Sequence, residues 1–597
     1  MIRISVIIPT FNRRRVLERT LPLLFSQDFP ADAYEVIVVV DGSTDGTRTW
    51  LESLRPSCAL TIINGEHRGA GAARNAGMKA ARGELILFLD DDLLCKPDLL
   101  KLHTASHSGS ERRIVHGPIY VDPGGTPSFI RLVTESFYES YYRSLDPEMQ
   151  LRYPDPVDEQ LSVLSSLINS SIPRDALLEC GGFDEEILAA EDYELGIRLY
   201  KNGCIFRFLP AAEVHEHYVK TSQQHLSGAA RALGAGDLRI SRKHPEFRIH
   251  SSLSGLAESS SIKRFILSVL VKSRVSLVPL LSFPLRWERW MIPVPIFRKF
   301  GLRLLALSER LVRLRSAAKA AGSWSQLRQE FILHCPALLY HHVGPKRPDM
   351  YVSLNVSAKK FEQQIRWLVS RGYQGISPSD WLHWLREGEE LPPKPILITF
   401  DDAYADTAEY ALPVLQRYGF PAAVYVVSAR VAATNTWDES QGSGTLRLMT
   451  AEQIQHWADN GIEFGGHSRT HADLVTLTPS ECKTEIDGSR LDLEALLGQA
   501  PESFAYPFGH FNEVAYAQAS SAFGLAFSTI EGMNYLRTDR HLLRRIYVGP
   551  SHSLLEFAFN VYRGRSVQPL NDLRIKLALR TRLKRALHSI SRKTKTD

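Results

Sequence analysis

The feature that most constrains the fold is an alternation of short apolar runs with helix-forming stretches, along residues 1–250 and again along 331–565. The apolar runs are rich in β-branched residues and many end in polar or acidic ones, as in VVVDGST at 38–44 and LFLDDDL at 87–93. This pattern predicts parallel strands joined by crossover helices, which is the α/β class. Because ligands bind at the carboxyl ends of such strands, the polar residues there are the first candidates for a functional site.

The chain has 597 residues, more than one hydrophobic core usually fills, so two or more domains are expected. Residues 1–250 are predicted to form a doubly wound α/β domain, and residues 331–565 a (β/α) barrel or a related layered fold. Residues 251–330 mix apolar residues, Trp and Arg, which predicts a basic amphipathic helical linker. Residues 566–597 are predicted to be a basic C-terminal tail.

Cysteine usage and the first residues predict a cytoplasmic protein. The cysteines lie far apart without a CxxC pair, which excludes a disulfide framework and suits a reducing compartment. The opening MIRISVIIPTFNRRR has an apolar run too short for a signal-peptide core, with its basic cluster on the wrong side. The six cysteines are Cys58, Cys95, Cys180, Cys204, Cys335 and Cys482.

Positive charge is concentrated in two segments. Residues 261–320 carry 13 Lys and Arg residues against two acidic residues, and residues 574–597 carry nine against one. The longest uncharged run, 275–285, has 11 residues, whereas a membrane-spanning helix needs roughly 20. A basic amphipathic helix on the anionic inner face of a membrane explains this composition, and a linker packed on either domain is the alternative. No nucleic-acid motif accompanies the charge, so no nucleic-acid partner is expected.

Acidic residues gather at two strand ends of the first block. Asp41 enters a tight turn, and Asp90, Asp91 and Asp92 follow one another directly. Carboxylates crowded in this way repel unless a cation or a donor-rich ligand neutralises them. Oxygen ligands suit Mg²⁺ or Mn²⁺ bridging to a diphosphate, and an acidic turn exposed to water is the alternative.

Six segments of the first block together resemble the family 2 glycosyltransferases. They are SVIIPTFNR, VVVDGSTDGT, GAARNAG, FLDDDL, GGFDE and AEDYELGIRLYKNG, in the order and spacing of that family, over roughly residues 3–220. The resemblance implies a GT-A type fold that binds a nucleotide sugar. It also implies inverting transfer of the sugar to a hydroxyl group of an acceptor.

Residue roles follow from the same resemblance. Asp92 would hold Mg²⁺ or Mn²⁺, and Asp192 would deprotonate the acceptor. His215 matches a position that sometimes supplies a further metal contact, with His217 close enough to be its alternative. The donor-binding residues implied are Thr10, Asp41, Arg74, Asp90 and Asp91.

The second block carries two histidines four residues apart, His467 and His471, in GGHSRTHADL. One helical turn would place both rings on one face, where they could bind one ion, and a polar surface loop is the alternative. Asp401 and Asp402 end a predicted strand in LITFDDAY. Two histidines and one carboxylate form a catalytic zinc set, in which a second carboxylate can act as base.

These segments resemble the polysaccharide deacetylases, the NodB-like group also called carbohydrate esterase family 4, over roughly residues 335–550. TFDD, HSRTH and AYPFG match its first three motifs. The resemblance implies that Asp401 is the general base and that the backbone N–H of Phe508 stabilises the oxyanion. It also implies that Zn²⁺ or another divalent transition metal is held by Asp402, His467 and His471.

The second block also departs from that family. Its third motif usually begins with an arginine, where this chain has Ala505 or Phe504, and no late Leu-x-His segment supplies a general acid. LLYHHVG resembles the poly-N-acetylglucosamine deacetylases, in which an early Tyr-His carries the acid. His341 is therefore the expected acid, with His342 and His510 as rivals. Arg545 would replace the missing arginine or form a surface ion pair.

Together these patterns predict a bifunctional enzyme of surface-glycan assembly. One site would transfer a sugar from a nucleotide-sugar donor to a glycan or lipid-linked glycan, and the other would remove an N-acetyl group from an N-acetylhexosamine. The alternative is that one domain is catalytic and the other binds glycans. Localisation is expected in the cytoplasm, with peripheral contact at the inner face of the membrane.

Overall fold

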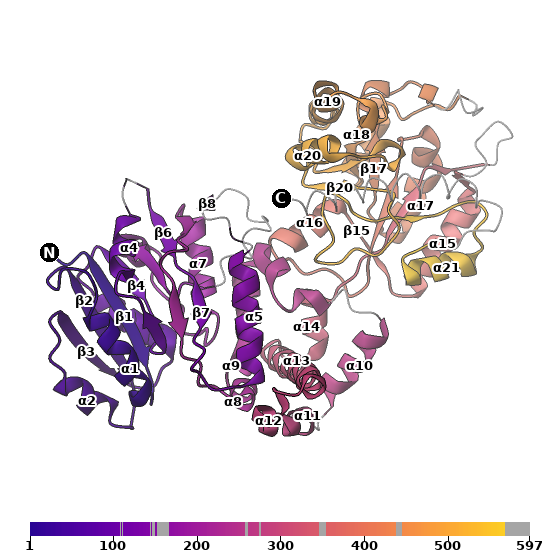
Figure 1. Ribbon diagram of the computed structural model, residues 1–597. Helices are drawn as coiled ribbons and strands as arrows, with labels where there is room; N and C mark the ends of the chain where they lie inside the picture. The colour runs from indigo at the N-terminus through magenta and orange to yellow at the C-terminus, as the bar shows by residue number, and fades with distance from the viewer. Residues whose placement is uncertain are drawn as a thin grey trace. The chain divides into compact units, whose positions relative to one another are not determined.

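The computed structural model describes residues 1–107, 109, 111–143, 145, 150–151, 166–256, 261–273, 276–345, 354–437 and 445–566 (Figure 1). The chain divides into two compact units, Met1–Leu327 and Arg328–Asp597. The predicted tail lies outside the described residues from 567 onward. All six cysteines are free thiols.

The first unit is built on an eight-stranded mixed sheet, in the order β3-β2-β1-β4-β9-β6-β10-β8. The first four strands of that order are parallel, and β9 is antiparallel to both of its neighbours. The strands are β1 (Ile4–Thr10), β2 (Tyr34–Asp41), β3 (Ala59–Gly65), β4 (Leu85–Phe88), β6 (Arg113–His116), β8 (Gln150–Leu151), β9 (Ser170–Pro173) and β10 (Ile205–Phe208).

Burial explains why these segments form strands and how their helices cover them. Every residue of β2 is buried, as expected for a strand in a sheet covered on both faces. Helix α3 packs closely on β1, because Gly77 has no side chain: a Cβ there would lie 2.5 Å from Ile7. The helices are α1 (Arg14–Phe25), α2 (Thr47–Ser53), α3 (Ala70–Ala80), α4 (Leu99–Ala105), α5 (Phe129–Arg143), α6 (Arg174–Glu179) and α7 (Glu191–Lys201).

The first unit also contains a small three-stranded sheet. Its order is β5-β11-β7, with β11 antiparallel to β5 and parallel to β7. Because successive residues of a strand face opposite ways, neighbours along β11 point into different surroundings. The strands are β5 (Leu93–Cys95), β7 (Ile119–Val121) and β11 (Val214–Glu216).

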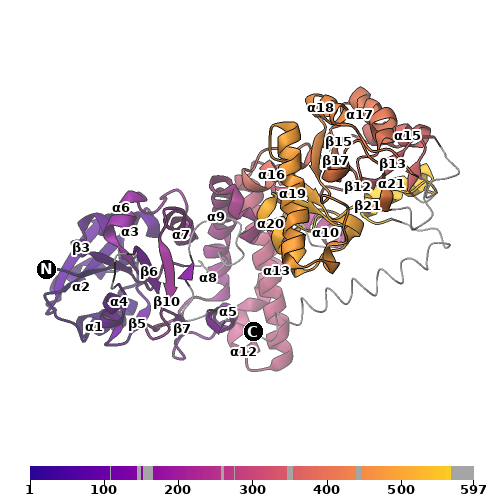
Figure 2. The ribbon, with the colours of Figure 1, turned by 90° about the horizontal axis from the view of Figure 1, so that it is seen from above.

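A layer of helices completes the first unit, with α13 lying against α9 (Figures 1 and 2). Phe129 and Leu226 pack with Leu305 and Val312 of α13 in one apolar core. The approach is close enough that a Cβ on Gly234 would lie 2.2 Å from the carbonyl oxygen of Arg313. The helices between residues 222 and 331 are α8 (Ser222–Ser227), α9 (Ala229–Lys243), α10 (Ser261–Lys272), α11 (Val278–Ser282), α12 (Glu288–Met291), α13 (Pro295–Ala320) and α14 (Trp324–Phe331), with a 3₁₀ turn η4 (Phe283–Trp287). The boundary between the two units falls within α14.

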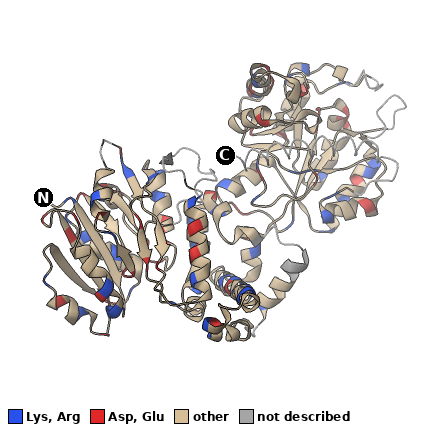
Figure 3. Cartoon of the chain, viewed as in Figure 1, with Lys and Arg blue, Asp and Glu red and all other residues tan. Residues whose placement is uncertain are grey.

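Lys and Arg residues recur along α13 (Figure 3). Within the described residues, no helix combines the length and the apolar character needed to span a bilayer. Residues 261–320, apart from the undescribed 274–275, fall within the first unit.

The second unit is a parallel sheet in the order β20-β19-β18-β17-β16-β12-β21, with β15 beside the start of β16. In the described part of this unit no ladder joins β20 to β21, so the sheet is an open relative of the closed barrel. The predicted α/β class is therefore confirmed in both units. The strands are β12 (Ala337–Tyr340), β15 (Gln374–Ile376), β16 (Pro395–Phe400), β17 (Ala423–Val426), β18 (Glu463–Gly466), β19 (Ser503–Ala505), β20 (Leu525–Phe527) and β21 (Ile546–Tyr547).

Helices connect these strands and pack on the sheet, as β-α alternation requires. All six residues of β16 are buried, which places the residues that follow it at the end of a fully covered strand. The helices are α15 (Ala358–Ser370), α16 (Pro378–Arg386), α17 (Leu412–Tyr418), α18 (Ala451–Asp459), α19 (Pro479–Leu497), α20 (Glu513–Ala522) and α21 (Leu554–Arg563).

Candidate active sites

A buried cluster of metal-ligand side chains lies at the carboxyl ends of β16 and β18. Asp402 comes just after β16, His467 directly follows β18, and His471 lies in the loop beyond it. The Nε2 atoms of His467 and His471 lie 3.4 and 3.1 Å from Oδ1 of Asp402. Across the described ranges, this is the one group of three His, Cys, Asp or Glu residues close enough together to hold an ion.

The two histidines meet through a loop and not through a helix. Residues 467–473 are not helical, and Ser468 and His471 have φ values of 58° and 63°. Such left-handed conformations cost a non-glycine residue about 1–3 kcal/mol and persist where the surrounding structure holds them. The helical face expected from the four-residue spacing is therefore wrong. Asp402 is in the same region, with φ of 73°, where the chain leaves its strand.

Hydrogen bonding sets which ring nitrogen faces the carboxylate. Nδ1 of His467 lies 2.7 Å from the carbonyl oxygen of Ala505, so it carries the hydrogen and donates, leaving Nε2 toward Asp402. Burial would raise the pKa of Asp402, but the imidazoles of His467 and His471 hold it well below the usual value. Oδ1 of Asp402 is buried and accepts no well-formed hydrogen bond. Two imidazoles and one ionised carboxylate oxygen without a donor fit an ion of the zinc type.

The neighbouring Asp401 is bound by a buried arginine. Both terminal nitrogens of Arg545 contact its carboxylate, at 2.6 and 2.8 Å, and Nε of Arg545 donates to the carbonyl oxygen of Ser528. Burial would raise the pKa of Asp401, but the guanidinium charge of Arg545 lowers it, so the carboxylate stays ionised. Arg545 is 1% exposed, which excludes the alternative of a surface ion pair.

The three candidate acids have different surroundings. Nδ1 of His341 is buried and makes no hydrogen bond, and burial lowers the pKa of this ring although Asp401 and Asp402 oppose that shift. Each rival is paired with a carboxylate of its own. Nδ1 of His342 lies 3.1 Å from Asp406, and Nδ1 of His510 lies 3.1 Å from Asp473.

Two aromatic rings flank His471. Phe508 lies edge-on to it with ring centroids 4.5 Å apart, and Trp437 stacks on it at 4.6 Å. Phe508 has φ of 57° in the turn after β19 and is 40% exposed. Sequence reasoning missed Trp437, because no motif marks a residue that reaches the site from a loop 30 residues upstream of His467.

In the first unit, Asp41 organises the loop that precedes α3. Its carboxylate accepts hydrogen bonds from the backbone N–H groups of Arg68 and Gly69, both at 2.9 Å, and lies 3.0 Å from Nδ1 of His67. Thr10, at the end of β1, donates to Asp91 at 2.8 Å. These two predicted donor-site residues therefore lie at the carboxyl ends of adjacent parallel strands.

Arginines neutralise the acidic run at 90–92. Arg13 contacts Asp91 and Asp92, both at 2.7 Å, and Arg74 contacts Asp90 at 2.7 Å and Glu191 at 2.6 Å. Burial raises the pKa of Asp91 to about 7, although Arg13 opposes this shift. The repulsion that the sequence implied is thus relieved by guanidinium groups. Arg13 was missed although it ends the quoted segment SVIIPTFNR.

Asp192 is the second residue of α7, next to Glu191. Its Oδ2 accepts a hydrogen bond from the backbone N–H of Leu167 at 3.3 Å, and its charge acts on both Arg74 and Glu191. Arg74 therefore joins Glu191, the neighbour of the predicted base, to Asp90, one of the predicted donor-site residues.

The two neighbours His215 and Glu216 on β11 have different surroundings. His215 lies 3.6 Å from Glu213, whereas Glu216 accepts from the hydroxyl of Tyr138. Burial, with the charges of Asp92 and Asp90, raises the pKa of Glu216 to about 8. In the β11–β5 ladder Glu216 pairs with Leu93, the residue that follows the acidic run. Glu216 was missed because the family resemblance drew attention to the histidine beside it. His217 pairs with Asp122 at 2.8 Å.

Comparison with known families agrees with this division. Glycosyl transferase family 2 matches residues 5–157, Glycosyl transferase family group 2 matches 85–340, and Polysaccharide deacetylase matches 388–527. The chain joins a family 2 glycosyltransferase domain to a polysaccharide deacetylase domain. Both domains belong to enzyme classes. The deacetylase match ends before Arg545 and begins after His341, although both residues lie at the site of Asp401.

Relatives of each domain are known separately. YxkH of Bacillus subtilis, assigned to the polysaccharide deacetylases, is 26% identical over 41% of this chain and 81% of its own length. Validoxylamine A glucosyltransferase of Streptomyces hygroscopicus subsp. jinggangensis is 34% identical over 34% of this chain. The matched region spans about half (52%) of that enzyme's own length. The solved deacetylase PplD of Streptococcus pyogenes is 25% identical and covers 38% of this chain and 98% of its own, with a TM-score of 0.34.

Proposed function

We propose that the chain is a bifunctional enzyme of surface-polysaccharide biosynthesis, with both domains catalytic. The glycosyltransferase domain would transfer a sugar with inversion from a nucleotide sugar to a glycan. The deacetylase domain would remove the N-acetyl group of an N-acetylhexosamine in that glycan. The observation that carries the proposal is the pairing of a metal-ligand set, Asp402, His467 and His471, with the ionised Asp401 beside it.

In the deacetylase site, Zn²⁺ or another divalent transition metal would be held by the three ligands. When bound, such an ion polarises the amide carbonyl and acidifies water. Asp401, kept ionised by Arg545, would accept the proton of the attacking water. His341 would give a proton to the departing amine nitrogen, and the backbone N–H of Phe508 would stabilise the oxyanion of the tetrahedral intermediate.

In the glycosyltransferase site, Asp192 would accept the proton of the acceptor hydroxyl as its oxygen attacks the anomeric carbon opposite the leaving diphosphate. Asp92 would hold Mg²⁺ or Mn²⁺, which when bound neutralises that diphosphate. His215 would be a further metal contact only if its ring left Glu213. The donor pocket would be lined by Thr10, Asp41, Arg74, Asp90 and Asp91.

The acceptor is proposed to be a lipid-linked glycan, reached by peripheral contact with the anionic inner face of the membrane from the cytoplasm. Two tryptophans support this contact, because Trp287 and Trp290 are 49% and 76% exposed within the basic helical layer. Exposed aromatic rings beside cations are typical of helices that lie at a membrane interface.

The test is to incubate the Asp92→Ala and Asp401→Ala proteins with a panel of nucleotide sugars and acceptors, following nucleoside diphosphate and acetate release together. We expect D92A to lose diphosphate release and retain acetate release from a preformed N-acetylated glycan. D401A should show the reverse. If wild-type protein releases only one of the two products, the other domain is a glycan-binding module and the proposal is wrong. The buried Arg545 argues against that alternative, since it supplies the charge that the third motif lacks.

A further inference from the structure

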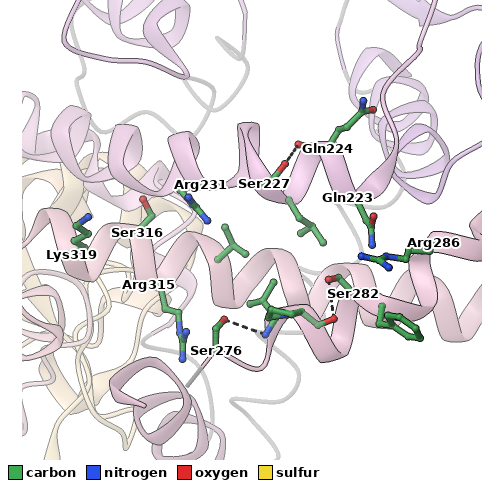
Figure 4. Close-up of a pocket in the computed structure, with 15 residues that line it drawn as sticks. Gln223, Gln224, Ser227, Arg231, Ser276, Ser282, Arg286, Arg315, Ser316 and Lys319 are labelled. Atoms are coloured by element: carbon green, nitrogen blue, oxygen red, sulfur yellow. Dashed lines mark hydrogen bonds between the residues drawn. The ribbon is translucent and has the colours of Figure 1, made fainter. Parts of the chain in front are cut away.

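A cavity of about 840 Å³ opens within the helical layer of the first unit, between α8, α9, α11, η4 and α13 (Figure 4). Four cations line it: Arg231, Arg286, Arg315 and Lys319. They come from three different elements, and the described residues that line the cavity include no acid. A cavity with this lining favours an anionic group.

Three acidic residues of the same helical layer, on α9, α12 and α13, have other partners. Glu309 lies 3.4 Å from His225 and 3.5 Å from Arg313, and Asp237 lies 3.4 Å from Arg313. Glu288 accepts hydrogen bonds from the backbone N–H groups of Phe129 and of α8. Among the described residues, no ion pair joins these carboxylates to Arg231, Arg286 or Lys319, and Arg315 donates hydrogen bonds to the carbonyl oxygens of Leu270 and Ser273.

The rest of the lining is amphipathic. Leu226, Val278 and Val312 supply apolar walls, while Ser282 and Gln223 supply hydroxyl and amide groups near Arg286 (Figure 4). A small inorganic anion would leave the apolar walls without contacts. A ligand with a charged, oxygen-rich head and an apolar body uses both kinds of surface.

The cavity adjoins an exposed aromatic surface, which is formed by Phe283, Trp287 and Trp290. Phe283 lines the cavity, its ring centroid lies 5.0 Å from that of Trp287, and the guanidinium of Arg286 lies 5.3 Å over it. In the flanking helices α11 and α13, Leu280 and Ile296 are both 72% exposed. Large apolar side chains exposed together in one segment mark an interaction surface, and with cations interleaved they fit a lipid interface.

We propose that this cavity binds the phosphate group of an anionic phospholipid, whose acyl chains extend over the aromatic surface into the bilayer. The inference rests on the peripheral membrane contact proposed above and adds a specific lipid-binding site to it. The cations would contact the phosphate oxygens, and the apolar walls would contact the glycerol and the first methylene groups.

The experiment uses the full-length protein and dihexanoyl-phosphatidylglycerol below its micellar concentration, with binding followed by isothermal titration calorimetry. We expect saturable binding of one lipid per chain. Arg231→Gln/Lys319→Gln should weaken it at least about tenfold, because two contacts to the phosphate are lost. Both side chains are exposed, so the variant should unfold at the wild-type temperature.

The matched control is Arg298→Gln/Lys299→Gln, which removes two exposed charges of α13 outside the cavity. It should bind the soluble lipid normally and bind vesicles of phosphatidylcholine with phosphatidylglycerol more weakly. Equal loss of soluble-lipid binding in both variants, or no binding by wild type, overturns the site. If the protein shows no specific binding of soluble lipid but still floats with vesicles, the lipid-binding site is wrong and the peripheral membrane contact is still supported. The experiment therefore distinguishes failure of one proposal from failure of the other. If glycerol 3-phosphate binds as tightly as the lipid, the ligand is a soluble phosphate and the lipid assignment is wrong.

Discussion

Arg545 and Asp401 form a two-point contact, at 2.6 and 2.8 Å, although 144 residues separate them in the chain. Both side chains are buried. Arg545 is the residue just before β21, and Asp401 is the residue just after β16. The contact holds the proposed general base in one orientation and supplies the positive charge that keeps it ionised.

Arg545→Met should destabilise the second unit by about 3–5 kcal/mol, because it leaves a buried carboxylate without its partner. Acetate release should fall by at least about 100-fold, since the base is no longer oriented. Urea unfolding and acetate assays measure both effects. Adding Asp401→Asn should restore part of the stability and none of the activity. A double mutant no more stable than R545M would contradict the assigned pairing.

His471→Ala should abolish tight zinc binding, because it removes one of three ligands. Metal content after dialysis is the measurement, and we expect about one equivalent in wild type and less than a tenth of that in the variant. His456→Ala is the matched control, since His456 is an exposed histidine of α18 in the same unit. Full metal content in H471A would show that the ion binds elsewhere.

Glu216→Gln should lower the kcat/KM of glycosyl transfer at least about tenfold, because Glu216 pairs with Leu93, next to the acidic run, and is affected by the charges of Asp92 and Asp90. His215→Ala should change it by less than about threefold, since that ring lies against Glu213. Nucleoside diphosphate release measures both. The two positions are adjacent on β11, so local damage to the strand would affect both variants alike. A large loss in H215A with a small one in E216Q would support the histidine as the metal contact.

Glu194 should make the first unit sensitive to acid. Its side chain is fully buried, which would raise its pKa, but hydrogen bonds from His244, Arg198 and Lys243 lower the pKa below the usual value. A depressed pKa stabilises the fold above the unfolded-state pKa of about 4.3, and this stabilisation is lost as the pH falls below that value. Wild type should therefore lose about 1.7 kcal/mol of unfolding free energy between pH 6 and about pH 3 through this group.

Glu194→Gln tests that contribution by urea unfolding at both pH values. The variant should be less stable than wild type at pH 6 and should lose less on acidification. Glu52→Gln is the control, because Glu52 pairs with Arg48 on the surface and should change either value by under about 0.5 kcal/mol. If wild type and E194Q lost the same unfolding free energy between the two pH values, Glu194 would not be the source of the acid sensitivity.

Much of both candidate sites could be predicted because the reactive side chains follow strands. Asp41, Asp402 and His467 each end or follow a buried apolar run, and parallel strands bring such positions to one edge of a sheet. The spacing of His467 and His471 was interpreted as a helical turn. The backbone there adopts left-handed conformations that a spacing argument does not contain.

The sequence by itself determined the α/β class, the two enzyme families and the strand-end aspartates and histidines, because local periodicity and short motifs encode them. Only the tertiary structure decided which charge meets which: Arg545 with Asp401, Arg13 with Asp91 and Asp92, and His215 with Glu213. Only the tertiary structure brings the basic helices together around a cavity. Such pairings depend on strand order and side-chain direction across long stretches of chain, and neither is encoded in any one local segment.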